Sequence, residues 1–339
     1  MKKISLLIAS LAGVLMLTTS CNDEWTEEQY TQYISFKAPL NDNGVSAVYV
    51  PFTRHNLDGT PLYGSSVSSY DLPVIVSGSL TNGRDITVHV SHDTDTLGIL
   101  NYARYQMRTD LYYEDMSEYA EYPSTITIKA GEDVGLLPVT FKFNGIDMRH
   151  KWVLPIQVDD DDSYNYTSHP RKHYAKAMLR VYPFNDYSGD YSATTLTIAN
   201  ADDPTSATGS ETARAYVVDD NTVFFYAGNI DEDRLDRENY KVYFRFEGEN
   251  QGSVTVWSEN PDLEFVTDGR ASFRIYETMD EVQPYLMHRY VIINNINYDY
   301  VDYTSVPGYK RAYTAKGTLT LERKINTQIP DEDQAIQWY

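Results

Sequence analysis

The sequence has almost no cysteine, a shortage of basic residues and no long hydrophobic run. Its 339 residues include one cysteine, Cys21, so no internal disulfide can form and the fold must depend on the burial of side chains. The 28 Lys and Arg residues stand against 49 Asp and Glu residues, a net charge of −21. So acidic a chain repels nucleic acid and anionic lipid, which argues against both as partners.

Residues 1–21 have the pattern of a bacterial export signal. Two lysines follow Met1, and an apolar stretch runs from Ile4 to Leu17, which is shorter than the span of about 20 residues that crosses a membrane. A cysteine after small residues predicts a lipoprotein signal, in which Cys21 is acylated after cleavage. The alternative is a free thiol in an uncleaved tail, and Thr18 stands where an aliphatic residue is more common.

Hydrophobic residues alternate with polar ones along most of the remaining chain, for example at Leu137, Val139, Phe141 and Phe143. Turn signals separate these short segments, so the sequence predicts an all-β protein. After a polar tether at residues 22–30, we expect an N-terminal immunoglobulin-like β-sandwich over residues 31–183. A second antiparallel β domain follows over residues 186–325, as a small barrel or a second sandwich. Residues 326–339 are expected to form a tail.

Two segments depart from this pattern. The strand expected at residues 152–156 contains Pro155, which cannot donate to a ladder, so we expect this strand near an edge. Residues 97–122 lose the period of two and form a long aromatic insertion. Long insertions are often functional, and the alternative is a lid over the open end of the sandwich core.

No catalytic motif is present. The sequence lacks His-Glu-x-x-His, Gly-x-Ser-x-Gly and phosphate-loop patterns, and its seven histidines have no metal-binding spacing. Residues 231–238 match three of the four acidic positions of a family 18 glycoside hydrolase, but Arg234 occupies the fourth. The segment is too polar for a barrel strand and is expected to be a solvated loop. We therefore expect neither catalytic residues nor a required cofactor.

Two acidic segments leave calcium binding open. Asp159–Asp162 is a run of four aspartates, and residues 93–98 hold two alternating aspartates and a glycine. Calcium sites use carboxylates spaced along a loop, whereas a continuous acidic run is more often a solvated surface. Asp95-Thr96-Leu97 is also similar to the acceptor motif for Bacteroidetes O-glycosylation.

Several segments resemble one family. Asp23-Glu24 is similar to the acidic export tag of Bacteroidetes lipoproteins displayed on the outer face of the outer membrane. The segments Tyr70–Val74, Ile128–Gly131 and Trp152–Ile156 resemble an N-terminal domain of unknown function in lipoproteins of polysaccharide-utilisation loci, also found ahead of family 18 glycoside hydrolases. The junction at residues 185–189 and the ending at 322–338 resemble its usual C-terminal partner.

This resemblance implies an accessory protein at the cell surface. It would be lipid-anchored in the outer membrane, would face the outside, and would bind or accompany a glycan. A glycan importer complex or neighbouring hydrolases are the implied partners. The resemblance brings no catalytic motif and assigns no ligand residue by position.

Aromatic side chains are the best candidates for glycan contact, because the chain contains 30 tyrosines and 4 tryptophans. Tyr and Trp offer a flat face together with a hydrogen-bonding group. The candidates are Trp257, Tyr298, Tyr300, Tyr303 and Tyr309. Residues 294–310 are expected to form a long loop; the alternatives are a tyrosine-rich strand packed on the barrel and a tryptophan in the core.

The sequence therefore predicts a non-catalytic surface lipoprotein that binds a polysaccharide or glycan for uptake. The alternative is an adhesion or structural lipoprotein that contacts protein partners. A glycoside hydrolase is less favoured, because no pair of acids stands out among the 49.

Overall fold

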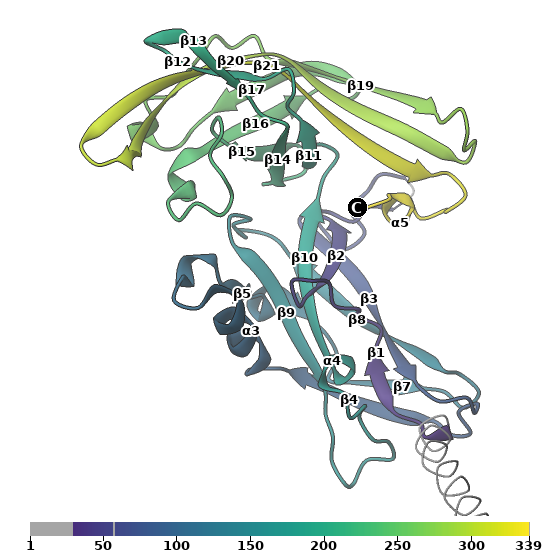
Figure 1. The fold of residues 1–339 in the computed structure, drawn as a ribbon. Helices are drawn as coiled ribbons and strands as arrows, with labels where there is room; N and C mark the ends of the chain where they lie inside the picture. The colour runs from purple at the N-terminus through teal and green to yellow at the C-terminus, as the bar shows by residue number, and fades with distance from the viewer. Residues whose placement is uncertain (1–29, 57, 339) are drawn as a thin grey trace, which may run out of the picture.

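The computed structural model describes residues 30–56 and 58–338, and it consists of a β-sandwich and a β-barrel joined end to end (Figure 1). The predicted all-β class is confirmed, since strands account for nearly all of the regular structure. Cys21 and the export signal lie outside the described residues. None of the helices in the described ranges has the length and hydrophobicity of a membrane span.

The sandwich is built from two sheets. One has the order β1 (Ile34–Phe36), β3 (Val67–Val76), β8 (Val134–Lys142), β6 (Ala120–Glu121). The other has the order β2 (Ser46–Pro51), β10 (Lys176–Phe184), β9 (Lys151–Val158), β4 (Ile86–His92), β7 (Thr125–Ile128), and β5 (Tyr113–Asp115) also pairs with β9. Alternate residues of both sheets face inward and form one core that includes Leu72, Val139, Val88 and Leu154. The hydrophobic residues of the predicted alternating segments are therefore the ones that face the core.

The first half of the aromatic insertion covers the outer face of a sheet, and its second half covers the sandwich core, to which it contributes the fully buried Met116. The insertion contains α3 (Thr96–Tyr105), the 3-10 turns η1 (Thr109–Leu111) and η2 (Ser117–Tyr119), and strands β5 and β6. Leu97 of α3 and Tyr113 of β5 pack with Val153 and Met178, which project from the outer face of β9 and β10. Strand β9 is consequently buried on both faces. A short helix, α4 (Lys172–Ala175), precedes β10.

The second domain is a closed antiparallel barrel. Its strands are β11 (Gly189–Ser192), β12 (Thr197–Asn200), β13 (Asp203–Gly209), β14 (Thr212–Val217), β15 (Thr222–Tyr226), β16 (Lys241–Glu247), β17 (Gln251–Trp257), β18 (Val266–Thr267), β19 (Ser272–Met279), β20 (Leu286–Val306) and β21 (Tyr309–Asn326). The 3-10 turns η3 (Arg237–Tyr240) and η4 (Pro261–Leu263) lie in its connections. The ring closes because β21 pairs with β11 on one side and with β20 on the other. Of the two architectures left open by the sequence, the structure has the barrel.

The barrel has no open lumen, because aromatic and aliphatic side chains fill it. Tyr191 and Phe244 are 0% and 1% exposed, and they pack in one cluster with Val242 and Ile293. Small barrels of this kind are commonly filled by their own side chains. Binding must therefore occur on the outside of the barrel or where it meets the sandwich.

The prediction of a loop at residues 294–310 is wrong, because most of these residues belong to the long hairpin β20–β21. The Asn294-Asn295 pair reads as a turn in the sequence, but the ladder continues beyond it after a shift in register between Ile293 and Ile296. Asn295 takes a left-handed conformation there, with φ of 56°, which is typical of a β-bulge. The residues after the bulge remain strand because β21 pairs with them.

The C-terminal tail folds back onto the junction between the domains. Helix α5 (Glu332–Ala335) follows the barrel, and Trp338 then stacks on Tyr49 of the sandwich with centroids 4.4 Å apart and rings 2° from parallel. Arg323, 6% exposed, donates to the Ser188 carbonyl at 2.7 Å and lies over the Trp338 ring. Figure 1 shows α5 in the angle between the two domains. The tail thus helps to hold the barrel on the sandwich.

Candidate functional site

A row of four aromatic side chains crosses the outer face of the barrel where the sandwich meets it. Register places Tyr216 of β14 opposite Phe224 of β15, Phe224 opposite Tyr243 of β16, and Tyr243 opposite Trp257 of β17. The Tyr216–Phe224 and Tyr243–Trp257 pairs are stacked, with centroids 4.9 and 5.3 Å apart. Directly opposed residues are the closest side-chain neighbours in an antiparallel sheet. We call these four residues the aromatic row.

The sandwich covers the middle of the aromatic row and leaves its two ends accessible. Phe224 is 2% exposed and belongs to the same apolar cluster as the sandwich core. Tyr216, Tyr243 and Trp257 are half-buried. Each end of the row therefore presents part of an aromatic face to solvent, next to polar side chains from both domains.

Beside Tyr243 is a cleft of about 380 Å³, which we call the junction groove. The sandwich contributes Asp147 and Arg149, and the barrel contributes Glu238, Asn239, Lys241, Tyr243, Glu259 and Asn260. Trp257 stacks on Tyr243 at its edge. The lining of the groove is polar apart from Tyr243, so it offers one aromatic ring among fixed hydrogen-bonding groups.

Ion pairs between the domains fix the floor of the junction groove. Lys241 Nζ donates to both carboxylate oxygens of Asp147, at 2.7 and 2.8 Å, and Arg149 pairs with Glu238. Burial opposes the charge on Asp147, but hydrogen bonds from Lys241 and the Arg149 backbone outweigh it and hold the pKa of this carboxyl below its usual range. Asp147 is therefore ionised, and both acids are engaged by cations.

The far wall of the junction groove offers an amide and a carboxylate. Asn260 Nδ2 donates to the Asn239 carbonyl at 2.7 Å and to the Tyr303 hydroxyl at 2.9 Å, which fixes its orientation. The Tyr243 hydroxyl lies 3.4 Å from Glu259, and burial together with this carboxylate raises the pKa of Tyr243 to about 12. The groove thus combines an aromatic face, an oriented amide and a carboxylate acceptor.

Two of the predicted residues lie beside the groove: the Tyr303 hydroxyl accepts a hydrogen bond from Asn260, and Trp257 stacks on Tyr243. The structure separates the other candidates. Tyr298 and Tyr300 are 5% and 3% exposed and lie in the barrel core, so the prediction that they are surface residues is wrong. Tyr309 is 56% exposed at the tip of the β20–β21 hairpin, beneath the guanidinium of Arg311.

The two buried tyrosines have a structural role that explains their position. The Tyr298 hydroxyl accepts a hydrogen bond from the Gly228 backbone at 3.3 Å. Gly228 has a φ of +57°, and a Cβ at this position would collide with the ring of Tyr300. Tyr298 and Tyr300 therefore hold the loop after β15 against the barrel.

The acidic segments considered for calcium do not assemble a site. Asp159, Asp160 and Asp161 each accept a hydrogen bond from a nearby serine hydroxyl or backbone N–H. Asp93, 2% exposed, accepts from the first backbone groups of α3 and pairs with Lys176 at 2.8 Å. Within the described ranges, no three His, Cys, Asp or Glu side chains are grouped to hold a metal ion.

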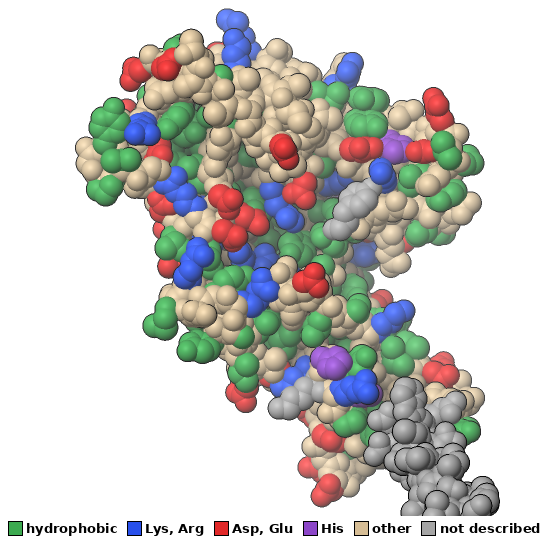
Figure 2. Space-filling model, in the orientation of Figure 1, with side chains coloured by type: hydrophobic (Ala, Val, Ile, Leu, Met, Phe, Trp, Pro, Cys, Tyr) green, Lys and Arg blue, Asp and Glu red, His purple; other side chains and the backbone are tan. Residues whose placement is uncertain are grey.

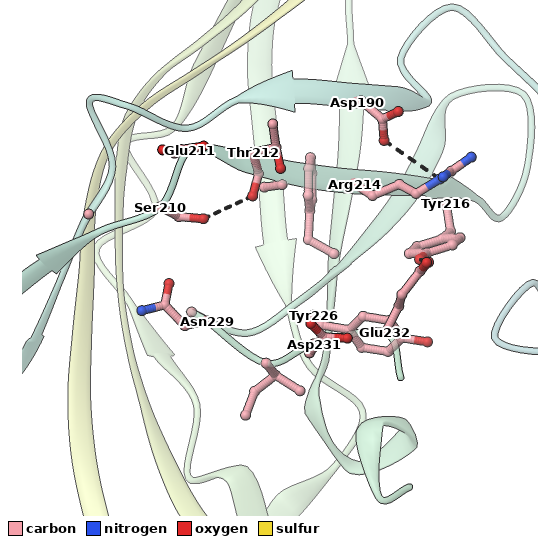
Figure 3. Close-up of a pocket in the computed structure, with 15 residues that line it drawn as sticks. Asp190, Ser210, Glu211, Thr212, Arg214, Tyr216, Tyr226, Asn229, Asp231 and Glu232 are labelled. Carbon is pink, nitrogen blue, oxygen red and sulfur yellow. Dashed lines mark hydrogen bonds and ion pairs between the residues drawn. The ribbon is translucent and has the colours of Figure 1, made fainter. Parts of the chain in front are cut away.

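A second cavity, of about 560 Å³, lies at the other end of the aromatic row, and we call it the lateral pocket. Figure 3 shows it between the strand that carries Arg214 and Tyr216 and the loop that carries Asn229, Asp231 and Glu232. The Tyr216 hydroxyl donates to Glu232. Sequence reasoning named Trp257 at one end of the row and missed Tyr216, Phe224 and Tyr243, although the alternation at β16 already marked Tyr243 as facing away from the interior.

Comparisons with known proteins identify the family. A model described as a domain of unknown function, DUF4973, matches residues 25–162, and a C-terminal domain model matches residues 175–320. A crystal structure of an auxiliary nutrient binding protein from Bacteroides thetaiotaomicron is 51% identical, with a TM-score of 0.82 over 91% of this chain and 100% of the other. The chain belongs to this two-domain Bacteroides family. The predicted family resemblance is therefore confirmed.

Other members of the family have been solved without an assigned function. A Bacteroides ovatus protein of unknown function is 38% identical, with a TM-score of 0.80 over 91% of this chain and 100% of its own. A multidomain protein including DUF1735 from the same species is also 38% identical, with a TM-score of 0.78 over the same shares. No curated protein matches the chain.

Proposed function

We propose that this protein is a non-catalytic glycan-binding lipoprotein of the outer membrane, and that the junction groove is its binding site. The observation that carries the proposal is the stacked pair Tyr243–Trp257 beside Glu259 and Asn260. The relative described as a nutrient binding protein supports the same class of function.

The chemistry of the groove suits a sugar. The C–H face of a pyranose ring stacks on an exposed aromatic face, while its hydroxyls donate to carboxylates and exchange hydrogen bonds with amides. Tyr243, with Trp257 stacked on it, supplies the aromatic ring, and Glu259 supplies an acceptor. Asn260 has donated both N–H groups and supplies its amide oxygen. Because Asn260 is already oriented by Asn239 and Tyr303, less side-chain entropy is lost on binding.

The acids of the groove support binding without catalysis. Glycoside hydrolysis requires one carboxylic acid that stays protonated near neutral pH and a second carboxylate nearby. Asp147 and Glu238 are each paired with a cation, and the lowered pKa of Asp147 keeps it ionised. Residues 231–238, which partly match the hydrolase signature, form a loop and the turn η3 at the domain junction.

The arrangement of the domains agrees with display at a surface. The first strand begins at the end of the sandwich that lies farthest from the barrel (Figure 1). An acylated Cys21 upstream of it would therefore hold the barrel and the junction groove away from the membrane. A glycan handed to an importer or hydrolase complex would meet the groove first.

Affinity electrophoresis of the mature chain against a panel of plant, fungal and host polysaccharides tests the proposal. Sites of this size bind with millimolar to micromolar affinity, or about 4–8 kcal/mol. Trp257→Ala should weaken the retained interaction at least tenfold, or about 1.4 kcal/mol, in a chain that remains folded at the assay temperature. Tyr309→Ala, at the hairpin tip, is the comparison variant.

The outcomes separate the competing sites. Loss of retention in Tyr309→Ala but not in Trp257→Ala would move the site to the hairpin tip. Retention of no polysaccharide by the wild-type chain would refute glycan binding. Release of reducing sugar that persists through purification and disappears on substitution of one acid would refute the non-catalytic assignment.

Protein binding is the second candidate function, and one feature favours it. Ile99, Tyr102 and Met107 are 68%, 65% and 84% exposed on or just after α3, and Figure 2 shows green side chains standing out on that side of the sandwich. Exposed apolar groups near one another are typical of protein contacts. Crosslinking in intact cells that is lost on Met107→Glu, together with no glycan retention, would favour this function.

A further inference from the structure

The lateral pocket lies where the barrel ladder is interrupted. Strands β14 and β15 pair at two positions, Tyr216 with Phe224 and Val217 with Val223. The earlier residues of β14 pair with β11 on their other side, and in the described chain they have no ladder partner on the side of β15. The barrel wall therefore splits there, and the lateral pocket occupies the split.

The walls of the lateral pocket carry the same kinds of group as the junction groove. Tyr216 and Tyr226 contribute half-buried aromatic faces, and Asn229, Ser210 and Thr212 contribute an amide and two hydroxyls. Its volume of about 560 Å³ falls within the range of about 300–1,000 Å³ that is usual for small-molecule pockets.

The negative charge of the lateral pocket favours a neutral ligand over an anionic one. Four acids line the lateral pocket, Asp190, Glu211, Asp231 and Glu232, against one cation, Arg214. Arg214 lies 3.6 Å from Asp190 and is partly neutralised by it, as the dashed line in Figure 3 shows. An anionic ligand would be repelled, whereas carboxylates accept hydrogen bonds from neutral hydroxyl groups. In Figure 2, red and blue side chains surround the hollow between barrel and sandwich.

The two cavities are separate. They lie at opposite ends of the aromatic row, and Phe224 between them is 2% exposed beneath the sandwich. The Lys241 ammonium, which is held by Asp147, lies 4.8 Å from the centroid of the Phe224 ring. A sugar chain therefore cannot run along the row from one cavity to the other, and each must take its own ligand segment.

We infer that the lateral pocket is a second carbohydrate site, selective for neutral sugars, so that one chain binds two glycan segments on either side of the domain junction. The inference rests on the proposed function. Two sites on a fixed junction raise the apparent affinity for a polymer above that for a short oligosaccharide, since the second contact is intramolecular.

The test is calorimetric titration of the full mature chain with neutral hexasaccharides, namely maltohexaose, cellohexaose, mannohexaose and xylohexaose, and with hexagalacturonate. The lateral-pocket variant is Asp231→Asn with Glu232→Gln, which keeps side-chain size and leaves an oxygen to accept from Tyr216. Its matched control is Asp202→Asn with Glu249→Gln, two exposed acids outside both cavities. Trp257→Ala removes the ring that stacks on Tyr243 at the edge of the junction groove.

We expect a neutral hexasaccharide to bind at two sites per chain. Trp257→Ala and the lateral-pocket variant should each leave one site, their combination should leave none, and the control should keep both. Loss of all binding in Trp257→Ala alone would overturn the inference and leave the proposed function standing. Tighter binding of hexagalacturonate than of the neutral sugars would overturn the ligand class. Absence of binding by the wild-type chain to any probe would overturn the proposed function itself.

Discussion

The pair Asp147–Lys241 joins the two domains beneath the junction groove, so its removal should loosen both the junction and the site. Exposed ion pairs contribute about 0.2–1 kcal/mol, whereas breaking a buried pair costs about 3–5 kcal/mol. The Lys241 side chain is 14% exposed and that of Asp147 is 38% exposed, which places this pair between the two limits. We expect a coupling energy of about 1–2 kcal/mol.

A double-mutant cycle measures this coupling directly. Asp147→Asn, Lys241→Met and the combined variant are unfolded in urea, and the cycle removes the effects that each substitution has alone. The control cycle uses Asp85→Asn and Lys129→Met, because this pair has an N–O distance of 2.9 Å but side chains 53% and 63% exposed. A coupling at the junction no larger than at the control pair would refute the reasoning.

The same pair should make stability depend on pH with a defined sign. The pKa of Asp147 in the folded protein lies below its value of about 3.8 in the unfolded chain. Its contribution is therefore complete above the ordinary carboxyl range and is lost as the pH falls through the lowered value. Asp147→Asn should reduce the difference between unfolding midpoints measured at pH 7 and pH 3.

Three further outcomes follow from contacts elsewhere in the molecule. Trp338→Ala should cost about 2 kcal/mol in urea unfolding, since a half-buried tryptophan loses about half of the full core penalty, and an unchanged midpoint would contradict the role of the tail. Hydrogen bonds that the His288 ring donates, above all to Glu322, raise the pKa of His288. Their stabilisation is complete below pH 6.5 and fades as the pH rises through the raised value, and Glu322→Gln should lower this pKa in an NMR titration. Gly228→Ala should reduce the free energy of unfolding by about 1–3 kcal/mol, because the added Cβ meets Tyr300. A reduction below about 0.5 kcal/mol in urea unfolding would argue against that contact.

Period-two alternation was sufficient to predict strands because burial on one face leaves a local signal. It could not predict pairing, which depends on residues far apart in the chain. Strand β9 was expected near an edge because of Pro155, yet it lies between β10 and β4. Its ladder with β5 ends at Val153 and its ladder with β4 begins at Ile156, so Pro155 sits where pairing on that side is interrupted. The prediction of a position near an edge is wrong, and Pro155 is tolerated inside the sheet because the pairing on that side is interrupted there.

The candidate site also shows that alternation predicts strands but does not predict which face of a strand is buried. Tyr298 alternates with the polar Asn297 and Asp299, whereas Tyr243 alternates with the apolar Val242 and Phe244. Both patterns say that alternate side chains face one way. Which way is inward is decided by closure of the barrel and by the sandwich, both of which are long-range contacts. Tyr298 and Tyr300 of β20 face the barrel interior and become core. The side chains at the ends of the aromatic row face outward and remain half-exposed, because the sandwich covers the middle of the row alone. The binding surface is therefore a product of how the two domains meet.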